Sequence, residues 1–215
     1  MLAGNLIGGT WTDGAGTTTR RIANPADTTQ LVADVREASL EQADDACAAA
    51  HAAFPGWRAT PPPERARVLF RYRELLEAHF DELAALAVRE NGKLLSEARG
   101  SVRRGLDVVE FACGIPSLLM GKTLPEISRN VDSYVVHEPI GVVVGIPPFN
   151  FPAMIPLWMM PLAVACGNPF ILKPAEKAPL TGTRLVELFA QAGLPSGVVS
   201  VLQGGKEVAE RLITN

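Results

Sequence analysis

The sequence predicts an α/β fold in which helices pack on a parallel sheet, and three observations support that prediction. The run from Ile140 to Ile146 is apolar and rich in β-branched residues, which is typical of a strand buried on both faces. It stops at Pro147-Pro148, because proline cannot donate ladder hydrogen bonds. A second short run, Phe170-Ile171-Leu172, follows an apolar stretch long enough for a crossover helix. Together these segments predict a βαβ unit.

The first part of the chain predicts short strands and then a helix. Residues 5–33 contain strand-like pieces broken by glycine and Asn-Pro turns. Ser39 and Gln42 have the spacing of a capping box, which predicts a helix over residues 39–54.

Two further helices are predicted before the βαβ unit. Thr60-Pro61 supplies a cap and a first-turn proline for one long helix that Asn91-Gly92 ends. Its apolar residues recur at helical spacing and predict a core stripe: Leu69, Tyr72, Leu76, Phe80, Leu83 and Ala87. Another helix is predicted from Lys93 to Phe111. The sequence contains no internal repeat.

Composition favours a cytoplasmic protein with free thiols. The formal net charge is −3, and three cysteines give no even-numbered disulfide framework. No basic surface for nucleic acid and no secretory signal are indicated. Residues 151–172 are apolar, but their prolines favour a buried helix over a membrane span. The three histidines lack ligand spacing, so no metal site is predicted.

Ligands of open parallel sheets bind at the carboxyl ends of the strands, which selects residues 147–152 and 173–177. Both segments carry polar side chains that a simple connection does not require. Asn150 offers a neutral amide donor, and Lys173 and Glu176 offer opposite charges. A turn in a proline-rich loop is the alternative reading of Asn150, and a solvated turn is the alternative for Lys173 to Glu176.

These two segments resemble signature segments of the NAD(P)-dependent aldehyde dehydrogenase superfamily. The matching residues are Pro148-Phe149-Asn150-Phe151-Pro152 and Lys173-Pro174-Ala175-Glu176. Other segments extend the resemblance over essentially the whole chain: Asn24-Pro25-Ala26, Glu90-Asn91-Gly92-Lys93, Gly167-Asn168 and residues 192–199. Phe149, residues 104–110, Gly114-Ile115-Pro116 and residues 154–160 are most similar to the CoA-acylating methylmalonate-semialdehyde dehydrogenases.

The resemblance implies the N-terminal part of an aldehyde dehydrogenase-type fold, with helices on a Rossmann-like parallel sheet. It implies a helical part of the cofactor domain over residues 1–122 and a βαβ part over residues 139–215. It also implies an arm over residues 123–138 that pairs with another subunit, and therefore a homo-oligomer. No GxGxxG motif occurs, because the family uses a variant fold without it.

The resemblance also implies roles for individual residues. Asn150 would donate to the aldehyde oxygen in an oxyanion hole, which is a catalytic role. Lys173 and Glu176 would hold the adenosine ribose, and the acidic Glu176 favours NAD over NADP. The remaining residues implied in cofactor binding are Ile146, Pro147, Phe149, Gly204 and Gly205.

Arg104 matches an arginine that the methylmalonate-semialdehyde branch directs at its substrate's carboxylate, and a planar guanidinium suits that role. A solvent-facing helix arginine is the alternative. CoA would be the acyl acceptor in this branch, whereas other semialdehyde dehydrogenases use water.

The family's catalytic cysteine has no expected counterpart among Cys47, Cys113 and Cys166. Each of these three residues is expected to be a small buried apolar side chain. The chain alone is therefore expected to be inactive, as the cofactor-binding portion of an NAD-dependent enzyme. A noncatalytic module that binds nucleotide and associates with other subunits is the alternative from a different class.

Overall fold

The computed structural model describes residues 4–215, and it confirms the predicted α/β fold. A five-stranded sheet with the strand order β2-β1-β9-β8-β7 lies at its centre. The parallel part consists of β7 (Val143–Gly145), β8 (Phe170–Leu172) and β9 (Val199–Val201). Two strands extend it antiparallel, β1 (Asn5–Ile7) beside β9 and β2 (Thr10–Thr12) beside β1. The sheet is thus mixed, and β1 covers the edge of β9.

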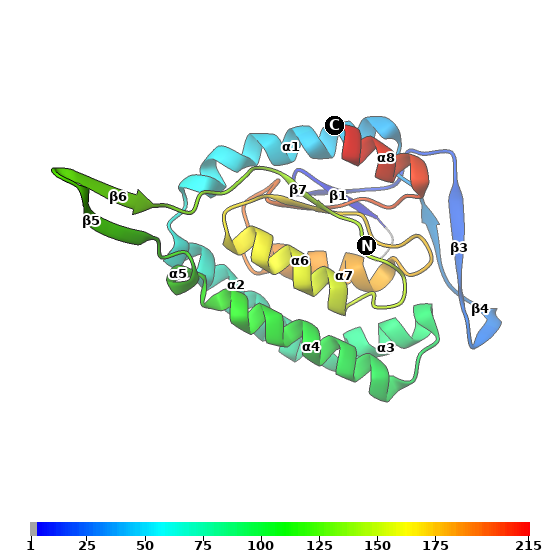
Figure 1. The fold of residues 1–215 in the computed structure, drawn as a ribbon. Helices are drawn as coiled ribbons and strands as arrows, with labels where there is room; N and C mark the ends of the chain where they lie inside the picture. The colour runs from blue at the N-terminus through cyan, green and yellow to red at the C-terminus, as the bar shows by residue number, and fades with distance from the viewer. Residues whose placement is uncertain (1–3) are drawn as a thin grey trace.

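Helices cover both faces of this sheet (Figure 1). One face packs against α1 (Leu40–Ala59), which in turn contacts α8 (Lys206–Thr214). The other face packs against α6 (Met154–Ala165) and α7 (Leu180–Gln191). The crossover helix predicted between β7 and β8 is therefore confirmed as α6.

A second helical layer lies against α6 and α7. It consists of α2 (Pro62–Ala78), α3 (Phe80–Asn91), α4 (Leu95–Cys113) and the short α5 (Ile115–Leu118). Tyr72 of α2 is fully buried in this layer, where it stacks on Phe189 of α7 at 4.0 Å between ring centroids. Its hydroxyl donates to the carbonyl of Leu185 at 3.1 Å. The predicted apolar stripe is core, as expected, and only Phe80 in it is half-buried.

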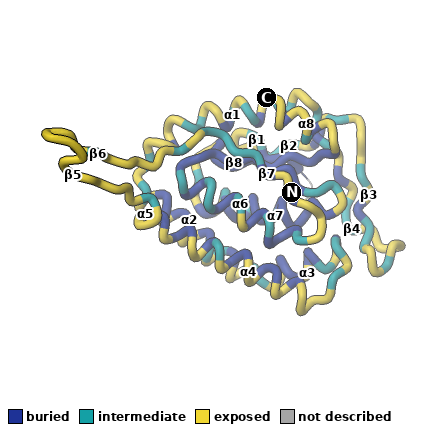
Figure 2. Tube along the Cα trace, viewed as in Figure 1, coloured by how far each residue is buried: buried dark blue, intermediate teal, exposed yellow. Residues whose placement is uncertain are grey.

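Two hairpins stand apart from the sheet. The first pairs β3 (Thr19–Asn24) with β4 (Asp27–Arg36), and the second pairs β5 (Lys122–Ser128) with β6 (Val131–Val135). The β5–β6 hairpin projects from the body and is exposed along nearly all its length (Figure 2).

The strand predicted over residues 140–146 is shorter and more exposed than the sequence indicates. Only Val143–Gly145 forms β7, and Ile140 is 88% exposed. Among residues 4–215 β7 is the outer strand of the sheet, with β8 as its one neighbouring strand. The carboxamide oxygen of Asn168 also accepts from the N–H groups of Ile140 and Gly141, at 2.8 and 3.0 Å. These two N–H groups are satisfied without a ladder partner, and the prediction of a strand buried on both faces is wrong.

The single helix predicted from Thr60-Pro61 to Asn91 is in fact two helices. His79, with φ −104° and ψ 16°, separates α2 from α3. Thr60 does not cap α2 but lies at the end of α1, and Pro61 precedes α2 without any side-chain cap. The capping box of Ser39 and Gln42 is confirmed.

The first helix also continues five residues beyond its predicted end, through Pro55. Trp57 explains the extension, because it is buried and its indole donates to the carbonyl of Val164 at 2.8 Å. Arg65 also connects α1 with α6 through hydrogen bonds to backbone carbonyls. Its guanidinium is buried and donates to the carbonyls of Ala165 at 2.8 Å and Thr60 at 2.5 Å. Arg65 thus joins the C-terminal ends of α1 and α6.

No helix among residues 4–215 combines the length and the hydropathy that a membrane span needs. The apolar α6 has 12 residues.

Candidate functional site

The carboxyl ends of the three parallel strands bring the predicted site segments together. The N–H of Lys173 donates to Gly145 at 2.9 Å, and the N–H of Leu202 donates to Leu172 at 2.9 Å. These bonds continue the ladders past the strand ends. The loop after β7, the loop after β8 and the segment after β9 therefore start at one edge of the sheet, as parallel pairing requires.

The loop after β7 carries Ile146, Pro147, Phe149 and Asn150, and two side chains from the corner between α3 and α4 hold it. Asn91 donates its amide N–H to the carbonyl of Phe149 at 2.9 Å. Lys93 donates its ammonium to the carbonyl of Asn150 at 2.8 Å and lies 4.6 Å from the centre of the Phe151 ring.

The Asn150 carboxamide itself makes no hydrogen bond within the described part of the chain and is exposed. The loop backbone is thus fixed while the amide donor stays available to a ligand. Burial is the main cause that lowers the pKa of Lys93.

Glu90, the first residue of the same corner, holds the start of α7. It is 2% exposed, and its carboxylate accepts from the backbone N–H groups of Leu180 at 2.7 Å and Thr181 at 2.8 Å. A carboxylate at this position satisfies two unpaired N–H groups at a helix N-terminus and opposes the helix dipole. Burial raises the pKa of Glu90 to about 7, against the lowering effect of its hydrogen bonds from Thr181 and Leu180.

Lys173 is buried, at 4% exposure, and bonds to backbone instead of a carboxylate. Its ammonium donates to the carbonyls of Pro174 at 3.0 Å and Gly204 at 2.7 Å, which ties the end of β8 to the segment after β9. Burial is the largest cause that lowers its pKa, while nearby Glu176 and Glu37 raise it. An ammonium has three donors, so one N–H of Lys173 remains for a ligand.

Packing within the protein leaves little room for a side chain at position 204, and at position 205 a side chain would have to displace the guanidinium of Arg20. A Cβ at Gly204 would lie 2.5 Å from a methyl group of Val208, and one at Gly205 would lie 2.7 Å from Nη2 of Arg20. These contacts explain the absence of side chains here by packing within the protein, and the predicted role of Gly204 and Gly205 in cofactor binding stays a prediction.

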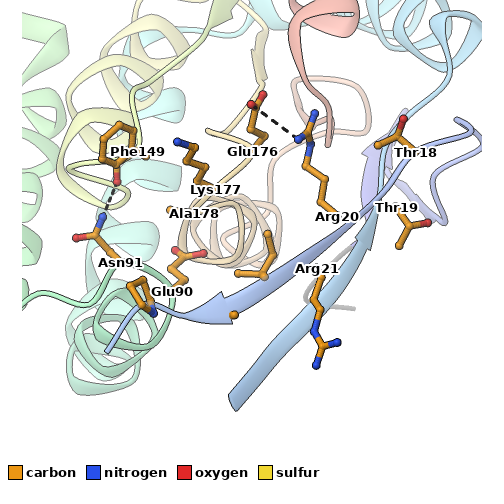
Figure 3. Close-up of a pocket in the computed structure, with 13 residues that line it drawn as sticks. Thr18, Thr19, Arg20, Arg21, Glu90, Asn91, Phe149, Glu176, Lys177 and Ala178 are labelled. Atoms are coloured by element: carbon orange, nitrogen blue, oxygen red, sulfur yellow. Dashed lines mark hydrogen bonds and ion pairs between the residues drawn. The ribbon is translucent and has the colours of Figure 1, made fainter. Parts of the chain in front are cut away.

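A cleft of about 620 Å³ opens beside these loops, between β3, the end of α3 and the loop after β8. Figure 3 shows Arg20 of β3 reaching towards Glu176 across the cleft. The two side chains are 4.0 Å apart, from Nη1 to Oε1, and both are half-exposed. Lys177 also lines the cleft and lies 5.6 Å from the centre of the Phe149 ring. The cleft thus combines acceptors and donors suited to a polar, partly anionic ligand.

Arg104 lies in a second cleft of about 500 Å³, which Phe151 of the Asn150 loop also lines. This cleft is lined by α4 together with Lys93 and Phe151. The neighbouring Arg103 instead points to Glu77 and makes two hydrogen bonds with it, at 2.8 and 2.9 Å. Arg104 forms no ion pair with the residues that the structure describes. The structure therefore separates the two arginines, and only Arg104 faces a cavity.

The three cysteines are free thiols, and burial raises the pKa of each. The pKa of Cys113 reaches about 11. A thiol with a raised pKa is a poor nucleophile. Only Cys113 is buried as expected, whereas Cys47 and Cys166 are half-buried. Across residues 4–215 no three histidine, cysteine or acidic side chains converge as metal ligands would.

Four residues of the site have no role in the sequence prediction. Glu90, Asn91 and Lys93 enter it only as parts of a motif and of helix ends, and Arg20 does not enter it. The position of the charged Glu90 next to a predicted helix end is only a weak indication of its role in the site. No sequence signal could have placed Arg20, because its position depends on how the β3–β4 hairpin folds back on the sheet.

Residues 11–215 match the model of the aldehyde dehydrogenase family. The chain belongs to this family. It is 50% identical over 209 residues to malonate-semialdehyde dehydrogenase 2 of Geobacillus kaustophilus and to malonate-semialdehyde dehydrogenase of Halalkalibacterium halodurans. These alignments cover 97% of the chain and 43% of each relative. The chain thus spans less than half the length of the curated relatives it matches.

Solved structures of the same family are also similar to this chain. The methylmalonate-semialdehyde dehydrogenase of Oceanimonas doudoroffii has a TM-score of 0.95 and 43% identity, covering 99% of this chain and 43% of that one. A structure from Sinorhizobium meliloti 1021, complexed with NAD, has a TM-score of 0.94 and 41% identity, with the same coverage. The predicted fold and family are confirmed.

Proposed function

We propose that this chain is the cofactor-binding portion of an NAD-dependent aldehyde dehydrogenase that oxidises malonate or methylmalonate semialdehyde to an acyl-CoA. One observation carries the proposal. The Asn150 loop and the Lys173–Glu176 segment meet at the carboxyl edge of the parallel strands, and the latter borders a polar cleft. The names of the relatives and the NAD in one similar structure support the substrate class and the cofactor.

The residues at the edge fit a dinucleotide. Glu176 can accept from ribose hydroxyls, and the remaining donor of Lys173 can reach the same sugar. The backbone after Ile146 and Pro147, with the ring of Phe149, would flank the ribose and nicotinamide. Gly204 and Gly205 leave the chain bare of side chains where it turns from β9 towards α8.

In this arrangement the residues of the chain have separate roles in the reaction. When bound, the cofactor would accept a hydride from the substrate carbon. Asn150 donates to the aldehyde oxygen, where negative charge develops, and so lowers the barrier. Lys93 and Asn91 keep the backbone of that loop in place, so the amide donor needs little reorganisation. The nucleophilic cysteine of the reaction is none of the three in this chain.

The cleft around Arg104 supports a substrate with a carboxylate. Arg104 and Lys93 place two cations beside the Asn150 loop, with Glu97 as a counter-charge. A guanidinium binds a carboxylate through two parallel hydrogen bonds, so a semialdehyde with a terminal carboxylate suits the cleft better than an alkyl aldehyde. CoA as acyl acceptor rests only on the resemblance of the sequence to the CoA-acylating branch, and water is the alternative.

We further propose three parts of the chain and an assembly. Residues 1–122 form the helical part of the cofactor domain, residues 139–215 its βαβ part, and residues 123–138 the oligomerisation arm. The exposed apolar residues of the arm support a homo-oligomer: Leu124, Ile127, Val131, Tyr134, Val135 and Val136. The three free thiols agree with a cytoplasmic location.

Titration of the purified chain with NAD, followed by calorimetry, tests the cofactor role. Saturable binding is expected, and Glu176→Ala should weaken it about tenfold or more, because a charged acceptor is lost. Glu210→Ala, an exposed position on α8, is the control and should leave binding unchanged. Absence of binding to the folded chain contradicts the proposal.

Kinetics of the complete enzyme test the catalytic role. Asn150→Ala should lower turnover about 10²–10³-fold with little effect on cofactor affinity. Equal losses of turnover and affinity speak against the oxyanion role. A noncatalytic module is the second candidate, favoured by the three cysteines with raised pKa. Self-association and nucleotide binding of the chain, with no aldehyde-dependent NADH formation by any protein that contains it, would support that candidate.

A further inference from the structure

Arg20 lies at the proposed ribose site although it belongs to a hairpin outside the sheet. Along β3, Ile22 is buried and Arg21 is exposed. Alternation along a strand puts residues two apart on the same face, so the burial of Ile22 turns Arg20 towards the protein. Figure 3 shows Arg20 pointing to Glu176, while Arg21 points away from it.

The guanidinium of Arg20 sits between two carboxylates. Its Nε pairs with Glu37, and its Nη1 lies 4.0 Å from Oε1 of Glu176. It also lies over the backbone of Gly205, since a Cβ there would be 2.7 Å from its Nη2 and 3.4 Å from Oε2 of Glu176. Glu176 is therefore not an isolated negative charge, and a cation lies beside the position where it would meet the ribose.

The charges around this point decide which ribose is accepted. A lone carboxylate accepts from a 2′-hydroxyl and repels a 2′-phosphate, whereas a nearby arginine accommodates the phosphate. Here Glu176 and Glu37 contribute two negative charges, and Arg20 with the buried Lys173 contributes two positive charges. The negative charges are thus balanced locally, and Arg20 keeps its remaining N–H donors for an incoming anion.

We propose that Arg20 is a specificity-determining residue that lets the site bind nucleotides with a 2′-phosphate in addition to those with a 2′-hydroxyl. This inference rests on the proposed nucleotide binding and deepens it. Binding of the phosphate would draw the guanidinium from Glu176 and form charge-assisted hydrogen bonds to its oxygens. Arg20 contributes much less to a nucleotide without that phosphate, because Glu176 alone accepts from the hydroxyls.

Calorimetric titration of the purified chain tests this assignment with four ligands: ADP-ribose, NAD, 2′-phospho-ADP-ribose and NADP. Arg20→Met should weaken binding of the two 2′-phosphorylated ligands about tenfold or more, and of the other two less than about threefold. Arg36→Met removes the same charge from an exposed position on β4 that does not line the cleft, and it should change the preference for phosphorylated over unphosphorylated ligands less than about twofold. Glu176→Gln should strengthen binding of the 2′-phosphorylated ligands severalfold.

Each outcome has one meaning. Equal weakening of the binding of all four ligands by Arg20→Met would mean that Arg20 only stabilises the hairpin. This result overturns the assignment. Binding of ADP-ribose by the unaltered chain without binding of 2′-phospho-ADP-ribose also overturns it, while the proposed cofactor role stands. Binding of none of the four refutes the proposed function itself. Thermal unfolding of each variant verifies that it is folded.

Discussion

Within residues 4–215 Arg65 is a buried cation without a carboxylate partner, and its replacement tests how the C-terminal ends of α1 and α6 are held together. Its two hydrogen bonds go to carbonyls at the C-terminal ends of α6 and α1, where the helix dipoles favour a positive charge. Arg65→Met removes both donors. The Ala165 carbonyl is left buried, at a cost of about 1–3 kcal/mol, and the Thr60 carbonyl costs less because water reaches it.

The expected loss in the free energy of unfolding is therefore about 2–4 kcal/mol. Urea unfolding followed by circular dichroism measures it, and Arg67→Met is the matched control. Arg67 lies on the same helix, is exposed, and makes no hydrogen bond to the residues that the structure describes. Its replacement should cost less than about 0.5 kcal/mol. Equal costs for Arg65→Met and Arg67→Met would refute the reasoning.

Two further predictions concern pH and assembly. The pKa of Glu90 is about 7 in the folded chain and ordinarily 4.5, so between these pH values the folded state binds more protons than the unfolded state. Stability should fall by up to roughly 3 kcal/mol as pH rises from about 4.5 to 7, and urea titrations across this range should show a much smaller slope for Glu90→Gln. A slope unchanged by the substitution would assign the pH dependence to other groups. In the β5–β6 hairpin, Leu124→Asp with Ile127→Asp should reduce self-association in sedimentation experiments while the melting temperature stays within a few degrees, because both side chains are exposed. An unchanged sedimentation coefficient would mean that the arm is not part of the interface between subunits.

The sequence predicted well those features that depend on local pattern. The βαβ unit follows from two apolar runs separated by a helix-length stretch, and the capping box of Ser39 follows from residue spacing. The two loops that carry Asn150 and Glu176 also follow, because parallel strands bring their carboxyl ends to one edge. The residues that the family resemblance assigns to them stay predictions of role, although their proximity is observed.

Features that depend on tertiary packing could not be predicted. Trp57 carries α1 past Pro55 through a bond to Val164, a residue more than a hundred positions away. The break between α2 and α3 lies at His79, where no glycine or proline in the sequence indicates the end of a helix. Whether β7 lies inside the sheet or at its edge depends on neighbouring strands, so an apolar run alone cannot reveal the 88% exposure of Ile140.

The corner from Glu90 to Lys93 contacts three separate places: the start of α7 and the carbonyls of Phe149 and Asn150. The distance between the loop after β7 and the loop after β8 is thus set by a segment that belongs to neither loop. This corner is therefore an attachment common to both loops, in addition to the paired strands from which they start. Transfer of either loop into another protein would therefore require transfer of the corner as well, because the loop sequence alone does not encode where its neighbour lies.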